Sequence, residues 1–314
     1  MLGIVILNYN NWKLTINCIN NINEIYNEPY NIYIIDNNSK DDSYRILKET
    51  FNQSKNIFIY NTGCNGGFSY GNNFGLKKAY QDNCDLILCT NNDVIFKENS
   101  INIMESKLLE NDDVAIVGPQ VLLQNGNRQE CTRKQMKYGN YIISKKPFIY
   151  FDFLGLSKKF KYNKYNYKDD LLVEGMVSGC CFMIKAKDLY DINFLDENIF
   201  LYHEEDIIGS KIRHINKKIL LVPSSIIIHL GGASTGKNNA FLRYINIESS
   251  LYYFKNYYKY NSIAYNFIVL FQYINFKIYS LKNKEYKQYA KKILKTAKEI
   301  KSNEFKNEHI KDNL

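Results

Sequence analysis

The stretch GIVILNYN, residues 3–10, decides the fold of this chain, because a short apolar run ends abruptly in polar residues. The same pattern returns in IYIIDNNS at residues 32–39 and in LILCTNND at residues 86–93. Apolar residues at helical spacing separate these runs, over about 41–51 and 69–80. Apolar strands that alternate with amphipathic helices predict a mostly parallel sheet with helices on both faces.

Each predicted strand ends in a polar cluster. The clusters are Asn8-Tyr9-Asn10, Asp36-Asn37-Asn38, Asn91-Asn92-Asp93, and a Gly-rich turn at 61–67 that follows a strand at 57–60. Open α/β sheets bind ligands at the carboxyl ends of their strands, so we expect a binding site at this edge. The glycines do not follow the first strand and lack the G-x-G-x-x-G spacing, which excludes a dinucleotide fingerprint. A close approach of the turn's backbone to a ligand is still expected.

Beyond residue 120 the pattern changes. Residues 120–170 are rich in Tyr, Lys and Asn, which predicts loops and a flap over the site. Further elements are expected as a strand at 176–184, a helix that opens with Glu204-Glu205-Asp206 and ends near 216, strands at 219–222 and 226–229, and helices beyond 240.

This pattern divides the chain into two parts. We expect residues 1–240 to form the main domain, in two halves at 1–120 and 121–240. Residues 241–314 are expected to form a helical extension.

The composition is that of a soluble globular protein, with 45% hydrophobic and 23% charged residues among 314. The formal charge of +9 suits a partner with phosphates or an anionic membrane surface. No run of Lys and Arg interleaved with exposed aromatic residues stands out before the last third, so no nucleic-acid partner is expected. Seven cysteines without a C-x-x-C pair predict free thiols in a reducing compartment. With no signal peptide and no apolar run of ~18 residues, a cytoplasmic location is expected.

Four carboxylates and one histidine are candidates for chemistry. Asp36 fits an Asx-turn or helix cap, or an acceptor of hydrogen bonds from a nucleotide base or ribose. Asp93 fits a turn, or a ligand for Mg²⁺ or Mn²⁺ beside substrate phosphates. Glu204 and Glu205 fit a helix N-terminus, or a general base whose pKa is raised by apolar and acidic neighbours. His229 ends an apolar strand and can be structural or a ligand.

Taken together, these segments resemble the inverting family 2 glycosyltransferases of the GT-A fold, in particular the rhamnosyltransferase-like members of bacterial surface-polysaccharide pathways. The resemblance runs in the family's order over about residues 3–260. The matching segments are 4–10, 34–39, 61–63, 66–67, 73–75, 88–93, 178–180, 195–197, 200–206 and 229–234.

The resemblance implies an α/β, Rossmann-like GT-A fold and a role for each matching residue. Glu205 occupies the position of the family's catalytic base, with Glu204 beside it. Asp93 matches the last Asp of the D-x-D metal motif, and His229 matches a histidine of the metal and diphosphate site. The donor would be bound by Asn8, Tyr9, Asp36, Asn38, Gly66, Asn73 and Asn92.

The chain departs from the family pattern at three positions. Asn91 stands at the first D-x-D position, which leaves the metal to Asp93 and donor phosphates. Asn72 stands where many relatives carry Arg, and Asp206 directly follows Glu205, so a neighbouring acid is the alternative base.

The implied reaction moves a sugar from a UDP- or dTDP-linked donor to a hydroxyl of a glycan or lipid-linked glycan in cell-surface polysaccharide biosynthesis. A carboxylate deprotonates the acceptor hydroxyl, a divalent cation neutralises the leaving diphosphate, and one displacement inverts the configuration. Two other functions are alternatives to this reaction. A sugar nucleotidyltransferase would open with a basic Gly-rich loop after the first strand, which is absent here. A catalytically degenerate glycan- or nucleotide-binding subunit on the same scaffold stays open because of Asn91.

The last third of the chain contains the candidate segments for contact with a membrane. Residues 262–279 are rich in Ile, Phe, Tyr and Val, and a Lys-rich helix follows them. They fit helices that pack on the domain with a solvated basic face, or a peripheral contact with an anionic membrane at the inner face of the plasma membrane.

Overall fold

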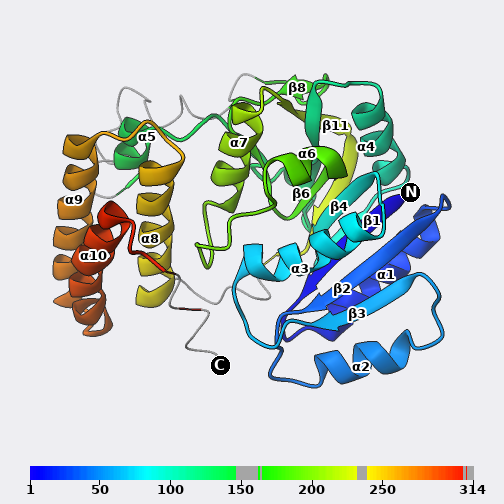
Figure 1. Ribbon diagram of the computed structural model, residues 1–314, viewed down its shortest axis with the longest axis horizontal. Coiled ribbons are helices and arrows are strands. Elements are labelled where there is room, and N and C mark those ends of the chain that lie inside the picture. The colour runs from blue at the N-terminus through cyan, green and yellow to red at the C-terminus, as the bar shows by residue number, and fades with distance from the viewer. Residues whose placement is uncertain (146–161, 163–164, 232–238, 307–308, 310–314) are drawn as a thin grey trace.

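The computed structural model describes residues 1–145, 162, 165–231, 239–306 and 309 (Figure 1). The strands are β1 (Leu2–Asn8), β2 (Tyr30–Asp36), β3 (Ile57–Asn61), β4 (Leu86–Asn91), β5 (Val94–Phe96), β6 (Val114–Leu123), β7 (Thr132–Arg133), β8 (Leu171–Leu172), β9 (Met176–Val177), β10 (Cys181–Lys185) and β11 (Lys218–His229). The helices are α1 (Trp12–Ile25), α2 (Ser43–Thr50), α3 (Phe68–Gln81), α4 (Ser100–Leu109), α5 (Tyr138–Ile143), α6 (Ala186–Asp191), α7 (Glu204–His214), α8 (Ala240–Asn256), α9 (Ser262–Ser280) and α10 (Glu285–Ser302).

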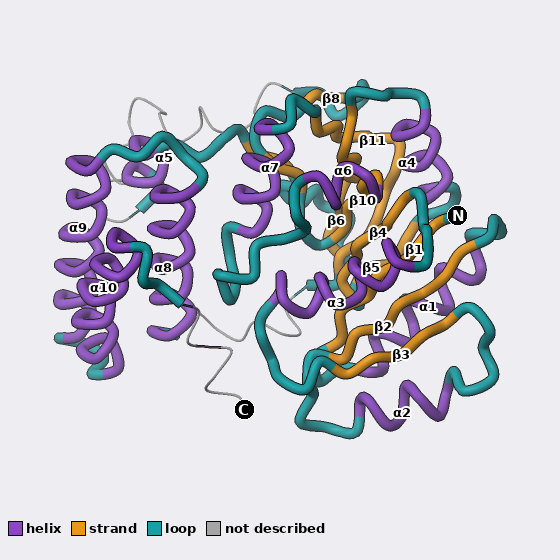
Figure 2. The backbone as a smooth tube through the Cα atoms, viewed as in Figure 1, coloured by secondary structure: helices purple, strands orange, loops and turns teal. Residues whose placement is uncertain are grey.

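The described residues form a mixed, nine-stranded sheet with the order β3-β2-β1-β4-β10-β6-β11-β5, and β8 pairs with β11. Strands β3, β2, β1 and β4 are parallel, as are β6 and β11. Strand β10 lies antiparallel between β4 and β6 and joins the two parallel blocks (Figure 2). The predicted α/β sheet with flanking helices is therefore confirmed.

The parallel block forms where the sequence is apolar without interruption. Ile4, Val5 and Ile6 of β1 have no exposed surface, because β1 lies between β2 and β4 and helices cover the sheet. Helix α3 approaches this block closely. A Cβ atom on Gly75 would lie 2.6 Å from Val5 Cγ1, so a larger residue there would push the helix off the sheet.

Three predicted strands differ from the structure. The strand expected over 176–184 is divided into β9 and β10, because residues 178–180 form a turn between them. The strands expected at 219–222 and 226–229 are one strand, β11, whose pairing with β6 shifts between Val222 and Ile226. Pro223 lies inside this shift, where a residue without a backbone N–H is tolerated.

The segment expected to be loops, 120–170, contains regular structure in its described part. Strand β6 continues to Leu123, and β7 and α5 follow. Helix α5, the short strand β7 and the end of β6 were missed because the apolar signal of this segment is diluted by Tyr, Lys and Asn. The flap predicted within 120–170 falls partly on residues 146–161 and 163–164, which lie outside the described residues.

The C-terminal helices α8, α9 and α10 have a hydrophobic core of their own, as expected of a helical extension. This core includes Ile199 and Ile207 and many aromatic residues, and it is separate from the core of the sheet. The three helices contact one another and lie side by side at one end of the molecule (Figures 1 and 2). Among the described helices, none combines the length and apolar character that a bilayer-spanning segment needs. All seven cysteines are buried and free, which confirms the prediction of free thiols.

Candidate active site

The carboxyl edge of the parallel block holds a closed network of polar side chains around Asp36. Asn8 at the end of β1 donates through Nδ2 to Asp36 Oδ1 over 2.8 Å. Asp36 Oδ2 accepts from Asn61 Nδ2 at 2.8 Å and from the backbone N–H of Ser39 at 3.0 Å. Asp36 and Asn8 are fully buried. The turn role of Asp36 is therefore realised, while its predicted contact with a donor stays a prediction.

Asn92 belongs to the same network and ties the turn after β4 to β1. Its Nδ2 donates to Thr15 Oγ1 at 2.9 Å, and Thr15 Oγ1 donates to Asn8 Oδ1 at 2.7 Å. Tyr9 and Asn38 lie half-buried at the rim of this network, and Asn38 adopts a left-handed backbone with a φ of 58°.

Gly66, Gly67 and Asn73 connect the start of α3 to the loop before α7. A Cβ on Gly66 would meet the Tyr70 ring at 2.3 Å, and one on Gly67 would meet the Phe200 carbonyl oxygen at 2.0 Å. Asn73 is buried and bonds both ways with Leu195, donating to its carbonyl at 2.9 Å and accepting from its N–H at 3.0 Å. The described contacts of these residues position the loop, and their predicted role in donor binding stays a prediction.

The two predicted metal ligands come together at the ends of different strands. His229 at the end of β11 places Nε2 3.3 Å from Asp93 Oδ1, in the turn between β4 and β5. The backbone supports this approach, because the N–H of Leu230 donates to the Asp93 carbonyl at 2.8 Å. Gln129, which the sequence did not single out, lies 3.0 Å from His229 Nδ1 through Oε1.

This arrangement fits a cation. An amide oxygen only accepts, so Nδ1 of His229 carries the proton that it shares with Gln129 Oε1. In the neutral ring, the lone pair of Nε2 then faces the carboxylate of Asp93. A cation between the two groups would stabilise this approach. Within the described residues no group of three or more His, Cys, Asp and Glu side chains is arranged to hold a metal. Further ligands would have to come from a substrate or water.

The acids at the start of α7 face the turn between β9 and β10. Glu205 Oε1 accepts from the backbone N–H of Gly179 at 3.1 Å. A Cβ on Gly179 would lie 3.0 Å from that oxygen, so the glycine permits the approach. Glu204 is buried, and burial, followed by the charge of Glu205, raises its pKa to about 8.

The backbone before these acids is strained. Tyr202 and His203 have φ values of 72° and 68°, which non-glycine residues rarely adopt. His203 pairs through Nδ1 with Asp206 Oδ2 at 2.9 Å. The other ring nitrogen, Nε2, and Glu204 Oε1 are buried and have no hydrogen-bond partner among the described residues. Strain and unpaired polar atoms at one place are typical of functional sites.

One pocket of about 380 Å³ contains both the acids and the histidine. Its lining includes Glu204, Glu205, His229, Asn91 and Gln129 (the residues of most chemical interest). The predicted donor-binding residues Asn8, Tyr9, Asp36, Asn38, Gly66, Asn73 and Asn92 do not line it. Two basic residues that do, Arg133 and Lys145, were missed because they lie in the Tyr- and Lys-rich segment without a recognisable pattern.

Two parallel blocks joined by an antiparallel strand form the GT-A fold that the sequence predicts, and a histidine–carboxylate pair and two neighbouring acids lie near one edge of this sheet. The chain belongs to glycosyl transferase family 2, whose family model matches residues 3–192. No curated protein sequence matches the chain.

Solved structures show the same fold at low sequence identity. The structure of GalNAc-T7 with UDP, GalNAc and Mn²⁺ matches with a TM-score of 0.60 and 12% identity, over 82% of this chain and 48% of that one. This chain thus spans about half the length of GalNAc-T7. S. aureus TarS 1–349 in complex with UDP-GlcNAc matches with a TM-score of 0.57 and 14% identity, over 95% and 81% of the two chains. The mannosyltransferase PcManGT from Pyrobaculum calidifontis, in complex with GDP-Man and Mn²⁺, matches with a TM-score of 0.52 and 12% identity, over 80% and 61%.

Proposed function

We propose that this chain is an inverting glycosyltransferase that moves a sugar from a UDP- or dTDP-linked donor to a hydroxyl of a glycan or lipid-linked glycan. The observation that carries the proposal is that Glu205 and His229, the latter 3.3 Å from Asp93, line one pocket. A base and a diphosphate site on the walls of one cavity are what this reaction needs. The structural neighbours crystallised with UDP, UDP-GlcNAc or GDP-Man support a nucleotide-sugar donor.

Asp93 and His229 would hold a divalent cation, Mg²⁺ or Mn²⁺, which neutralises the charge on the leaving diphosphate when bound. The Mn²⁺ in two of the neighbours supports this assignment. Asn91 stands where the family's motif has its first Asp, so the protein supplies a single carboxylate here. Gln129 would keep the ring of His229 turned toward the cation.

Glu205 would act as the general base. It takes the proton of the acceptor hydroxyl while the hydroxyl oxygen forms its bond to the anomeric carbon. The bond from that carbon to the diphosphate oxygen breaks, and the diphosphate leaves with the electron pair. Attack opposite the leaving group inverts the configuration. Glu204, whose pKa of about 8 keeps it protonated at pH 7, is less suited to this step.

The proposed division of labour follows the topology. Residues 1–120 would bind the nucleotide, 121–240 would bind the acceptor and carry the base, and 241–314 would form an extension. We propose a cytoplasmic role in cell-surface polysaccharide biosynthesis, with a rhamnosyl or other hexosyl donor.

The proposal includes a peripheral contact between α9 and an anionic lipid surface. Six apolar residues of the α9 region are between 46% and 86% exposed: Ile263, Phe267, Leu270, Ile274, Ile278 and Leu281. Spacings of three and four residues place them on one face of the helix, which we name the α9 stripe. A continuous apolar face of this length is unusual on a protein surface that only water covers.

Lysines flank the α9 stripe on the side of α10. Lys301 of α10 donates to Asn266 of α9 at 3.1 Å, which brings that side of α10 to the edge of the stripe. Helical spacing places four further α10 residues on the same side as Lys301, namely Lys287, Lys291, Leu294 and Lys298. An apolar face with a basic border fits the interface of an anionic membrane.

Binding to vesicles tests this contact. Wild-type protein should sediment with phosphatidylglycerol-containing vesicles and not with neutral phosphatidylcholine vesicles, and Leu270→Glu with Ile274→Glu should abolish the binding. Leu109→Glu is the matched control, because Leu109 is 67% exposed on α4, away from the stripe. Concentration-dependent dimers of wild type that the double variant abolishes, without vesicle binding, would assign the stripe to a second copy of the chain instead.

Thermal unfolding with UDP, dTDP, GDP and NAD, each with and without Mn²⁺, tests the enzymatic proposal. A ligand that binds only the folded state stabilises it by about 2.7 kcal/mol at a hundredfold excess over Kd. We expect a Mn²⁺-dependent shift with one pyrimidine diphosphate. A folded protein that no nucleotide stabilises would instead indicate the degenerate binding subunit.

A further inference from the structure

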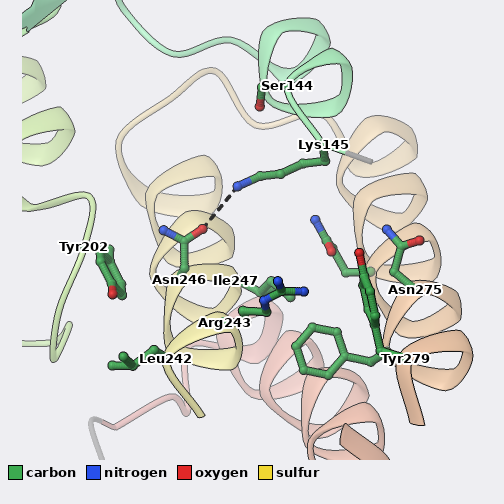
Figure 3. Close-up of a pocket in the computed structure, with 11 residues that line it drawn as sticks. Ser144, Lys145, Tyr202, Leu242, Arg243, Asn246, Ile247, Asn275 and Tyr279 are labelled. Carbon is green, nitrogen blue, oxygen red and sulfur yellow. Dashed lines mark hydrogen bonds between the residues drawn. The ribbon is translucent and has the colours of Figure 1, made fainter. Parts of the chain in front are cut away.

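A second cavity adjoins the pocket of Glu205 and His229. It has a volume of about 380 Å³ and lies among α5, α8 and α9 (Figure 3). The two cavities share Ser144, Lys145, Tyr202 and Asn246. His229 lines only the first cavity, and Arg243 lines only the second. The shared wall therefore lies between the proposed diphosphate site and the helical extension.

Lys145 belongs to this wall, and two further cationic side chains line the cavities on either side of it, Arg133 the first and Arg243 the second. Lys145, after α5, donates through Nζ to Asn246 Oδ1 on α8 at 3.2 Å (Figure 3). Arg243 on α8 enters the second cavity and lies 5.0 Å from the centroid of the Tyr279 ring. Arg133 on β7 lines the first pocket and donates to Met176 Sδ at 3.3 Å, a weak acceptor.

These cations are not neutralised by the part of the protein that the structure describes. Across the described ranges, no Asp or Glu lies within 4.0 Å of the charged nitrogens of Lys145, Arg133 or Arg243. Burial, and then the charges of Arg133 and Arg243, lower the pKa of Lys145 to about 8. Lys145 and Arg243 are half-buried, whereas Arg133 is exposed. Holding half-buried like charges near one another without a counter-charge costs free energy, which a bound anion would offset.

We propose that this wall binds a phosphate or diphosphate group of the acceptor glycan. The assignment rests on the proposed function, which places the donor's own diphosphate at Asp93 and His229. A guanidinium presents paired N–H donors that match phosphate oxygens, and a lysine adds a point charge. Tyr202 and the amide of Asn246 in the same wall offer an aromatic face and hydrogen bonds for the adjoining sugar. The substrate class is therefore a phosphorylated glycan, including a glycan joined to a lipid by diphosphate.

Binding of inorganic pyrophosphate, in EDTA and without nucleotide, tests the site directly. Calorimetry should show binding to wild type, and Lys145→Met and Arg243→Gln should each weaken it at least tenfold. Lys55→Gln removes an exposed lysine remote from the cavities and should bind like wild type. Lys145→Met should not lower the melting temperature, because it removes a like charge from the cluster. Equal binding by all four proteins, or none by wild type, would overturn the site.

Transfer kinetics distinguish the acceptor's phosphate from the donor's. With a phosphorylated acceptor, Arg243→Gln should raise the acceptor KM at least tenfold, and with the same glycan lacking phosphate the acceptor KM should change less than twofold. A raised donor KM instead would assign the wall to the donor's diphosphate and contradict our inference. The proposed function has its own test, since it fails if no nucleotide stabilises the protein. The pyrophosphate measurement contains no nucleotide, so its result does not depend on that test.

Discussion

Buried polar groups lie near one edge of the sheet in two regions, the network around Asp36 and the start of α7. The two regions differ in whether these groups have hydrogen-bond partners. Asp36 accepts hydrogen bonds from Asn8, Asn61 and Ser39, which occupy both its oxygens. At α7, Glu204 Oε1 lacks a hydrogen-bond partner among the described residues, and the backbone before it is left-handed. Paired groups stabilise a fold, whereas unpaired and strained ones are retained where they serve chemistry. Substitutions in the network around Asp36 should therefore change stability, and substitutions at the start of α7 should change activity.

The largest effect should come from Glu205→Gln. Loss of a general base lowers kcat by roughly 10²–10⁴, and the amide preserves the shape of the side chain. Donor binding and the unfolding midpoint should stay close to wild type. Steady-state transfer and thermal shift with nucleotide and Mn²⁺ measure both.

Glu98→Gln is the control for this change, because Glu98 is exposed before α4 and should transfer at the wild-type rate. Full activity of Glu205→Gln would show that Glu205 is not the base and that a neighbouring acid takes its role.

Asp36→Ala tests whether the network around Asp36 stabilises the fold. It leaves the donors of Asn8, Asn61 and Ser39 without their acceptor in a buried site, which should cost about 3 kcal/mol of unfolding free energy. Urea unfolding measures it. Asp42→Ala, an exposed aspartate six residues later, should change stability by less than about 0.5 kcal/mol. If Asp36→Ala stays stable but no longer binds nucleotide, the main role of Asp36 is to contact the nucleotide-sugar donor and not to stabilise the fold.

Glu204→Gln tests the buried acid at the start of α7 through the pH dependence of stability. Because the folded-state pKa of Glu204 is raised from 4.5 to about 8, the folded protein keeps a proton that the unfolded chain releases. Stability from this group is full below about pH 4.5 and is lost as pH rises toward 8. Glu204→Gln cannot ionise, so it should be more stable than wild type at pH 8.5, by about 1 kcal/mol or more. Parallel stability curves from pH 5 to 9 would show that Glu204 does not titrate in this range.

The sequence predicted the parallel block well, because its strands are apolar throughout and each ends in Asn or Asp. It also predicted that Asp93 and His229 would meet, through the family resemblance. It could not predict that Asn8, Asp36 and Asn92 bond to one another, since an Asn or Asp at a strand end looks the same whether it faces a ligand or a neighbour. Gln129 and Lys145 carry no sequence signal, because their roles arise only when loops from distant parts of the chain meet.

The smallest expected effect is that of Asn38→Gly, at the rim between network and site. Asn38 has a φ of 58°, which asparagine tolerates and glycine adopts freely, so stability should change by less than about 0.5 kcal/mol. Nucleotide affinity is then the informative measurement. The proposed donor contact requires weaker binding, because glycine removes the amide without moving the backbone. Unchanged affinity would place Asn38 with the structural network and confine the donor contacts to the edge nearer the pocket.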